Sequence, residues 1–272
     1  MIPAPVRYAR AYDVAHALEL LAEPDAKAIA GGQSLIPVMK LRIARPSLVV
    51  DISRLELRGV EIRDRELHLG PLTTWDELLG AAAIRRPALA AIAECASGIG
   101  DLQVRNRGTV GGSLAHADPA SDMPAVLLAL GATLGLRSAE GARVLAIADL
   151  FLGPFTTALE QTELITEIVV PLPPSGSGSA YVSVEHPASG FALAGAAALV
   201  RPDGSTTVAV TGVGSRPFPL PAERGPADAL AEAEIFGDRF APTEYRRHLA
   251  GVIVQRALER AGQRAEKDRS WK

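Results

Sequence analysis

Two glycine pairs dominate this sequence: Ala30-Gly31-Gly32-Gln33-Ser34 and Gly108-Thr109-Val110-Gly111-Gly112-Ser113. Each pair follows an apolar stretch and precedes small polar residues. Because glycine has no side chain, its peptide N–H can approach a phosphate closely, and neighbouring Ser and Thr hydroxyls add further donors. Two such loops in one chain predict a ligand with two phosphates, held between two lobes.

Length, charge and cysteine content restrict the class of protein. A chain of 272 residues can bury a full core and divide into two or three lobes. The formal net charge of −3 argues against general binding of nucleic acid. The single cysteine, Cys95, lies in an Ala-rich helical stretch, so we expect a buried packing residue and no iron–sulfur cluster on this chain. No signal peptide or apolar run of bilayer length is visible, which favours a cytoplasmic protein without a membrane span.

The first third of the chain predicts a compact βαβ unit. Lys27–Ala30 reads as a buried strand that ends at the first glycine pair. A helix over Ser34–Lys40 follows, with Pro37 tolerated in its first turn, and Leu48–Ile52 is the second strand. Asp13 is placed to cap the helix that precedes this unit.

The rest of the chain has a mixed pattern. The predicted strands of the middle third are Val60–Ile62, Glu66–Gly70, Ala132–Leu136, Arg143–Ile147 and Leu164–Pro171, and its helices are Thr74–Ile84, Ala88–Ala96 and Pro124–Leu130. The Pro/Gly/Ser-rich stretch Pro171–Ser179 marks a linker or a domain boundary. Beyond it we expect the strands Ala180–Glu185, Phe191–Arg201 and Thr206–Val213 and the helices Ala227–Ala233 and Tyr245–Arg260.

Neither glycine pair is a known nucleotide fingerprint. Both lack the Gly-Lys-Ser/Thr ending of a Walker A loop and the three-glycine spacing of a Rossmann turn. An isolated pair is more often a tight strand-to-helix turn. The dense run of small and polar residues from Asn106 to Asp122 favours a binding loop, because a plain surface loop needs no such density.

Several residues of this second loop have two interpretations. Asp122 is either the N-cap of the following helix or an acceptor for a ligand's hydroxyls. Arg105 and Arg107 either neutralise phosphate or pair with Asp101 and Glu94. His116 has no metal-ligand partner at helix or loop spacing, which favours a polar or packing contact. The sequence contains neither a Ser/His/Asp nucleophile elbow nor an H-E-x-x-H metal motif, so a bound cofactor is expected to carry the chemistry.

Together these residues resemble the FAD-binding medium subunit of molybdenum hydroxylases, the carbon monoxide dehydrogenase/xanthine dehydrogenase family. The matching motifs are Ala30–Leu35, Arg105–Ser113, Asp118–Asp122, Glu163–Pro171 and Tyr245–Ala250, and the match runs from about Pro5 to Ala261. The resemblance implies an α+β fold with a two-lobed PCMH-type FAD-binding domain over 1–173, made of a βαβ lobe (1–55) and a mixed antiparallel lobe (56–173). A C-terminal domain over 177–272 is expected to combine a three-stranded antiparallel sheet with a helix bundle.

The resemblance also implies which residues contact FAD. The two glycine loops would hold the phosphates and the adjoining ribityl and ribose groups, Asp122 would bond polar groups, and Leu164 or Ile165 would pack against the isoalloxazine or adenine. The expected cofactor-binding positions are Ile29, Ala30, Gly31, Gly32, Gln33, Ser34, Leu35, Ile99, Thr109, Val110, Gly111, Gly112, Ser113, His116, Asp122, Leu164 and Ile165. No catalytic or metal-binding side chain is expected. A Gly111→Val substitution is expected to abolish FAD retention and leave the fold intact.

The implied function is an electron relay. A molybdenum-cofactor large subunit and a small subunit with [2Fe–2S] clusters would deliver electrons to FAD on this chain, in a dimer of heterotrimers, and the flavin would pass them to an external acceptor. Val182, His186-Pro187 and Gly190 depart from the lysine, basic pair and acid that the family often has there. Two alternatives stay open: a stand-alone flavin oxidoreductase and a non-catalytic scaffold that has lost flavin.

Overall fold

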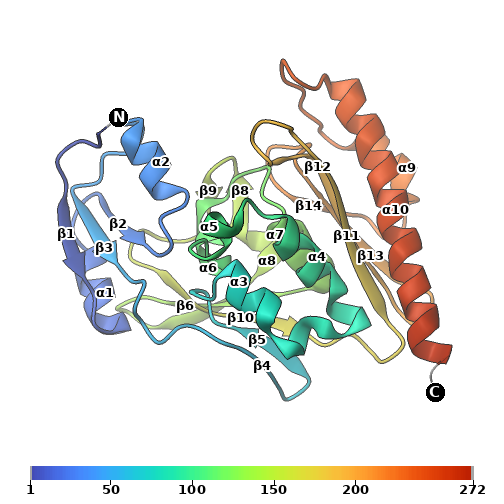
Figure 1. The fold of residues 1–272 in the computed structure, drawn as a ribbon, viewed down its shortest axis with the longest axis horizontal. Helices are drawn as coiled ribbons and strands as arrows, with labels where there is room; N and C mark the ends of the chain where they lie inside the picture. Colours follow the sequence, from blue (N-terminus) through green and yellow to red (C-terminus); the bar gives the residue numbers. More distant parts are fainter. Residues whose placement is uncertain (1, 271–272) are drawn as a thin grey trace.

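The N-terminal lobe is a small parallel sheet with two helices. The structure, a computed structural model, describes residues 2–270 (Figure 1). Strands β1 (Arg7–Arg10), β3 (Leu48–Asp51) and β2 (Ala26–Ile29) pair in that order and in parallel. Helices α1 (Val14–Leu21) and α2 (Leu35–Lys40) complete the lobe, and the Asp13 carboxylate accepts the His16 amide at 2.7 Å. The predicted βαβ unit is confirmed, whereas β1 was missed because its residues are polar and largely exposed.

The middle lobe is built on a five-stranded antiparallel sheet. Its order is β4 (Val60–Arg63), β5 (Glu66–Leu69), β10 (Leu164–Pro171), β6 (Thr133–Arg137) and β7 (Ala142–Ala146). Its helices are α3 (Trp75–Gly80), α4 (Ala90–Gly98), α5 (Leu102–Arg105), α6 (Val110–His116), α7 (Met123–Leu130) and α8 (Ile147–Leu150), and β8 (Phe151–Gly153) and β9 (Thr156–Thr157) form a hairpin. All eight residues of α7 are buried, which explains why its sequence is apolar on every side.

The predicted helix Thr74–Ile84 is interrupted. The Thr74–Glu77 capping box starts α3 as expected, but Ala81 is extended and a 3-10 turn over Ala82–Arg85 follows. A second 3-10 turn, Pro87–Leu89, leads into α4. The helix ends at Gly80, a residue with low helix propensity, and the local sequence otherwise looks helical.

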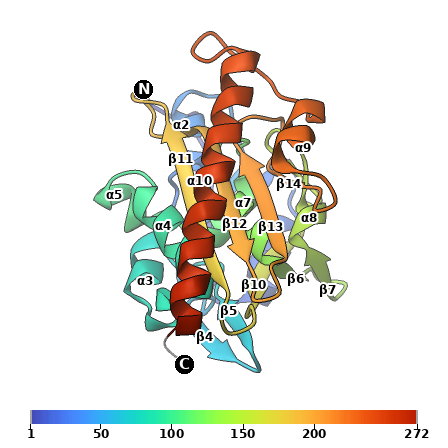
Figure 2. The same ribbon diagram turned by 90° about the vertical axis from the view of Figure 1, so that its right-hand side faces the viewer.

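The C-terminal sheet has four strands, one more than expected. It contains β11 (Gly178–Glu185), β12 (Ala192–Val200), β13 (Thr206–Thr211) and β14 (Phe218–Leu220), all antiparallel. The short edge strand β14 was missed because Pro219 interrupts the apolar pattern. Helix α9 (Pro226–Glu232) lies beside α10 (Thr243–Ser270), which crosses one face of the sheet and continues past the predicted end at Arg260 (Figure 2).

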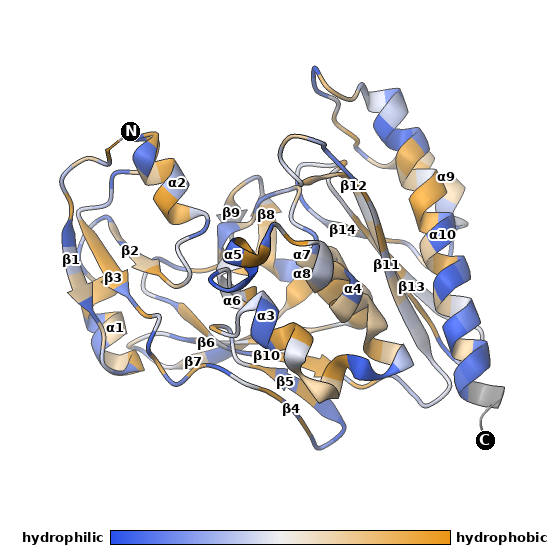
Figure 3. Cartoon of the chain, viewed as in Figure 1, coloured by the Kyte–Doolittle hydropathy of each residue, from blue (hydrophilic) through white to orange (hydrophobic). Residues whose placement is uncertain are grey.

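The C-terminal sheet is covered on both faces, and this determines where the site lies. Helix α10 packs on the outer face while α4 and α7 pack on the inner one. The inner face shares one continuous core with the middle lobe, to which Tyr181, Ala197 and Leu199 contribute. Helix α10 alternates hydrophobic and hydrophilic residues along its length (Figure 3), as a helix with one buried face should.

The Pro/Gly/Ser-rich stretch is a packed segment rather than a loose linker. Ser177 and Ser179 are fully buried, and the Ser179 hydroxyl accepts the Ala91 amide at 3.0 Å. A Cβ on Gly178 would lie 2.2 Å from the Ala261 carbonyl oxygen of α10. Small residues therefore stand here because the strand and the helix approach closely. Within residues 2–270, no helix combines the length and apolar character needed to cross a bilayer.

Candidate functional site

The two glycine loops are in direct contact. A Cβ on Gly31 would lie only 1.8 Å from the Arg107 carbonyl oxygen and 3.1 Å from the Gly108 Cα. The Gln33 side-chain amide donates to the Gln103 carbonyl at 3.4 Å, which adds a second link between the loops. Loops that are far apart in sequence therefore form one structure where the N-terminal and middle lobes meet, as the two glycine pairs suggested.

The first loop presents unused backbone donors. The amides of Gly31, Gly32, Gln33 and Ser34 donate to no group within residues 2–270. The Ser34 hydroxyl makes no capping bond to α2, and Gly32 has a φ of +77°, which a side chain would strain. A run of free N–H groups beside a free hydroxyl is a donor set suited to a phosphate, so this loop fits the pyrophosphate of FAD.

The second loop differs, because the chain itself uses its amides. Val110 donates to the Thr73 carbonyl at 3.1 Å and Gly111 to the Pro71 carbonyl at 2.8 Å. Thr109 is the N-cap of α6. The Gly112 amide donates to its hydroxyl, and the Ser113 amide donates to its carbonyl. The amides of Val110–Ser113 are therefore occupied by hydrogen bonds within the chain.

The expectation that Gly111→Val leaves the fold intact is wrong. A Cβ on Gly111 would lie 2.4 Å from the Pro71 Cβ and 2.9 Å from the Pro71 carbonyl oxygen. The missing side chain at this position makes room for the chain itself, so valine would disturb the loop's packing whether or not a ligand binds. Loss of FAD in that variant would not report on the position of the phosphates.

The predicted apolar contacts lie at the border between lobes. Ile29 ends β2 opposite Asp51, and Ala30 and Leu35 flank the first loop as half-buried residues. Leu164 packs in the N-terminal core, whereas the next residue, Ile165, belongs to the central core. Both are nearly buried, so only an edge of each side chain faces outward.

Arg105 does not make the predicted ion pairs. Its guanidinium donates to the carbonyl oxygens of Ile99 at 3.2 Å and Gly100 at 2.7 Å, and not to Asp101 or Glu94. It thereby holds the turn between α4 and α5 and fixes Ile99 against the central core. The Asp101 carboxylate instead caps α5 by accepting the Val104 amide at 2.8 Å.

His116 ends α6 as a half-buried packing residue. Its ring centroid lies 5.2 Å from that of Phe155, and burial lowers the pKa of the imidazole. Within the described residues, no group of three or more His, Cys, Asp or Glu side chains could hold a metal ion. The Ser113 hydroxyl hydrogen-bonds to the Ser121 hydroxyl at 2.7 Å and so links the second loop to the segment before α7.

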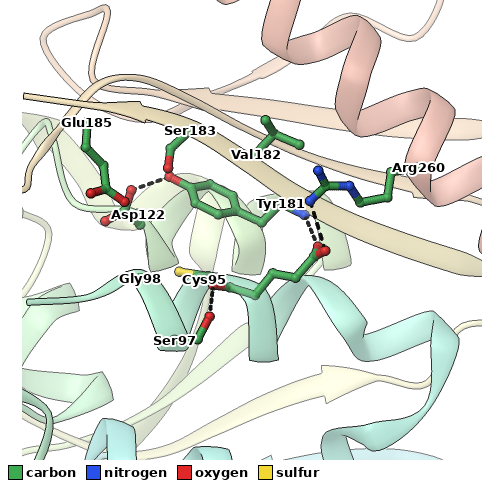
Figure 4. Close-up of a pocket in the computed structure, with 10 residues that line it drawn as sticks. Cys95, Ser97, Gly98, Asp122, Tyr181, Val182, Ser183, Glu185 and Arg260 are labelled. Carbon is green, nitrogen blue, oxygen red and sulfur yellow. Dashed lines mark hydrogen bonds and ion pairs between the residues drawn. The ribbon is translucent and has the colours of Figure 1, made fainter. Parts of the chain in front are cut away.

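Asp122 is not the side-chain cap of α7. Its carboxylate accepts a hydrogen bond from the phenol of Tyr181 on β11 (Figure 4). Burial raises the pKa of Asp122 to about 6, although the Tyr181 hydrogen bond acts in the opposite direction. Both residues line a cavity of about 300 Å³ between α4, β11 and α10, together with Val182, Ser183 and Glu185. The cavity thus joins Asp122 to the start of the stretch that departs from the family pattern.

The other wall of this cavity is a partly exposed ionic cluster. Glu94 on α4 accepts hydrogen bonds from Arg264 at 2.6 Å and Arg260 at 3.0 Å, and from the Tyr181 amide at 2.8 Å. Cys95 is buried as predicted, and burial raises the pKa of its thiol well above the ordinary value. The cluster joins α10, α4 and β11 at one point.

Sequence reasoning missed two residues that shape the site. Trp75 faces Gly108, where a Cβ would lie 2.8 Å from the indole nitrogen. Tyr181 lies against β12, where Gly195 leaves room that a Cβ would fill at 2.3 Å from the phenol oxygen. The Ala/Gly-rich sequence of β12 was a usable signal, because strands of small residues leave space for large side chains from a neighbour.

Known proteins share both the sequence and the fold. A family described as the FAD binding domain in molybdopterin dehydrogenase matches residues 4–173. The chain belongs to this family. Among curated relatives, the carbon monoxide dehydrogenase medium chain of Afipia carboxidovorans is 37% identical, covering 98% of this chain and 100% of the relative. The 6-hydroxypseudooxynicotine dehydrogenase complex subunit alpha of Paenarthrobacter nicotinovorans is also 37% identical, with 97% of each covered.

Solved structures agree. A chain of the cyanide-inactivated Cu,Mo-CO dehydrogenase superposes with a TM-score of 0.90 at 36% identity, covering 97% of this chain and 100% of that one. A chain of quinoline 2-oxidoreductase from Pseudomonas putida 86 gives 0.87 at 28% identity, with 97% and 99% covered. The protein is therefore an FAD-binding, medium-type subunit of an oxidoreductase of the molybdenum hydroxylase family, and the predicted α+β fold is confirmed.

Proposed function

We propose that this flavin subunit relays electrons from a molybdenum centre and [2Fe–2S] clusters on partner subunits to an external acceptor. Its relatives are named as medium chains or subunits of dehydrogenases, which supports a role within a complex. The lone buried cysteine is consistent with clusters on another chain. When bound, FAD supplies the ability to exchange electrons singly or in pairs.

The observation that carries the proposal is the set of unused amides at Gly31–Ser34. In the proposed site these N–H groups and the Ser34 hydroxyl bind the pyrophosphate. The Thr109 and Ser113 side chains approach from the second loop, and the Asp122 carboxylate accepts hydrogen bonds from the cofactor. The remaining contacts come from the apolar edges of the predicted residues Ile29, Ile99, Leu164 and Ile165.

The proposed assembly places this chain among partner subunits, as the names of its relatives suggest. In our proposal residues 1–173 bind FAD and residues 177–272 form the C-terminal domain, which closes the cavity beside Asp122. A large molybdenum subunit and a small iron–sulfur subunit complete a cytoplasmic heterotrimer, and two heterotrimers form a dimer. The similarity to complex subunits over nearly their whole length supports the presence of partner subunits.

One preparation tests the proposal. The chain is purified alone and with co-expressed large and small subunits, and flavin absorbance, iron and molybdenum are measured in each sample. We expect flavin in both preparations, metals only in the complex, and flavin reduction by substrate only in the complex. A colourless chain that refuses added FAD would point to a scaffold. Substrate turnover by the yellow chain alone would point to a stand-alone oxidoreductase.

A further inference from the structure

The Tyr181–Asp122 hydrogen bond joins two distant parts of the chain inside the cavity wall. Tyr181 comes from β11 of the C-terminal sheet and is 6% exposed. Its phenol donates to the carboxylate of Asp122, which stands at the start of α7 (Figure 4). A carboxylate expected to bond the cofactor is thus held by a residue outside the FAD-binding lobes.

The backbone and ring of Tyr181 are fixed. Its amide donates to Glu94, which Arg264 and Arg260 of α10 hold in turn. Its ring sits against Gly195, where any side chain would overlap the phenol oxygen. A phenol with so little room to move can fix the orientation of the group that it bonds.

The surroundings make Asp122 dependent on this bond. Three titratable groups interact with it: Asp118 from its own loop, Glu185 from β11 and the Cys95 thiol, held neutral by burial, from α4. Arg260, the cation on the cavity wall, is engaged by Glu94. Burial also disfavours the carboxylate form, and the Tyr181 hydrogen bond is the larger of the two contacts that stabilise it, the other being the backbone amide of Asp122.

We propose that Tyr181 is a positioning residue for the flavin site, whose phenol holds the Asp122 carboxylate in the orientation that accepts hydrogen bonds from FAD. This inference rests on the proposed FAD site. It assigns the C-terminal sheet a part in cofactor binding, because the sheet carries the phenol while the loop before α7 carries the carboxylate. Tyr181 acts through Asp122 and needs no contact with FAD of its own.

The test is the pH dependence of FAD affinity in Tyr181→Phe, measured by titrating the full apo chain with FAD from pH 5 to 8. Wild type should lose affinity below about pH 6, where Asp122 becomes protonated. Phenylalanine keeps the ring but removes a hydrogen bond to the charged form, which water replaces only in part. The midpoint should therefore rise by about 1 pH unit, so that affinity falls about twofold at pH 7 and up to about tenfold near pH 5, where both forms are mostly protonated.

Tyr8→Phe is the matched control. Tyr8 also donates to an aspartate, Asp51, at 2.5 Å, but in the N-terminal sheet. Burial raises the pKa of Asp51, yet the bonds from Tyr8 and Ser53 outweigh it and lower that pKa to about 2. Asp51 is therefore ionised throughout the assay range, and this variant should keep the wild-type midpoint.

The outcomes separate the inference from the proposed function. A wild-type chain that binds no FAD at any pH contradicts the proposed function itself. Wild-type binding with an unchanged midpoint in Tyr181→Phe, or a uniform loss at every pH, overturns the positioning role alone. Asp122→Asn gives a second measurement that does not need the tyrosine variant to fold. Its FAD affinity should be independent of pH between 5 and 8, and a wild-type midpoint in that chain would also overturn the inference.

Discussion

Replacing Gly31 by alanine tests whether contact between the two glycine loops creates the cofactor site. A real Cβ stays at 3.0 Å or more from a backbone atom, and here it would lie 1.8 Å from the Arg107 carbonyl oxygen. The loops must separate by about 1.2 Å, the difference between these two distances. Overpacking of this kind costs roughly 1–3 kcal/mol of stability.

The larger effect of Gly31→Ala should be on FAD affinity. A displacement of more than 1 Å moves the free amides of the first loop away from the pyrophosphate, and each hydrogen bond to a charged group is worth roughly 1.5–3 kcal/mol. Losing one such bond weakens binding about ten- to hundredfold. The assay is quenching of flavin fluorescence as the apo chain is titrated, beside a thermal melt without FAD.

Gly153→Ala is the control, because nothing lies within 4 Å of a Cβ at that position. It should keep both the affinity and the melting temperature of the wild type. If Gly31→Ala binds FAD as tightly as the control, the loop contact does not organise the site. If the apo chain loses all of its stability, the contact serves the fold and the affinity result has no bearing on the cofactor.

Three further outcomes are expected. Asp122→Asn should stabilise the apo chain at pH 7 by roughly 1–3 kcal/mol while weakening FAD binding. Burial raises the pKa of Asp122 from 3.8 to about 6, so its carboxylate costs stability as pH rises through this window, and denaturant melts should show a larger gain at pH 7 than at pH 4.5. Glu94→Gln should lower the free energy of unfolding by about 1–2 kcal/mol at pH 7. Burial raises the pKa of Glu94, but hydrogen bonds from Arg264 and the Tyr181 amide outweigh burial and lower it, so the carboxylate stabilises the fold above its ordinary pKa and this stabilisation is lost on acidification. Equal urea midpoints for the variant and the wild type at neutral pH would contradict this. Cys95 should react with a thiol reagent only after unfolding, since it is fully enclosed, and rapid labelling of the native chain would refute its burial.

Local patterns in the sequence predicted elements with strong periodicity and recognisable caps. The βαβ unit, the Asp13 cap, the Thr74–Glu77 capping box and strand Leu164–Pro171 are all present. The interruption after Gly80 could not be predicted because the sequence beyond it still looks helical, and the short strands β1 and β14 could not because they carry no regular apolar alternation. Their conformations depend on neighbours that are distant in sequence.

In the site, too, local sequence patterns and contacts between distant residues determine different features. The sequence by itself determined the family, the cofactor and the two loops, because glycine and small polar residues at those positions have a direct chemical meaning. Only the tertiary structure decided how each residue is used. Gly31 leaves room for the Arg107 carbonyl and Gly111 leaves room for Pro71. Asp122 accepts a hydrogen bond from the Tyr181 phenol instead of capping a helix. A backbone approach or a buried hydrogen bond depends on which surfaces folding brings together, and no local pattern records that partner.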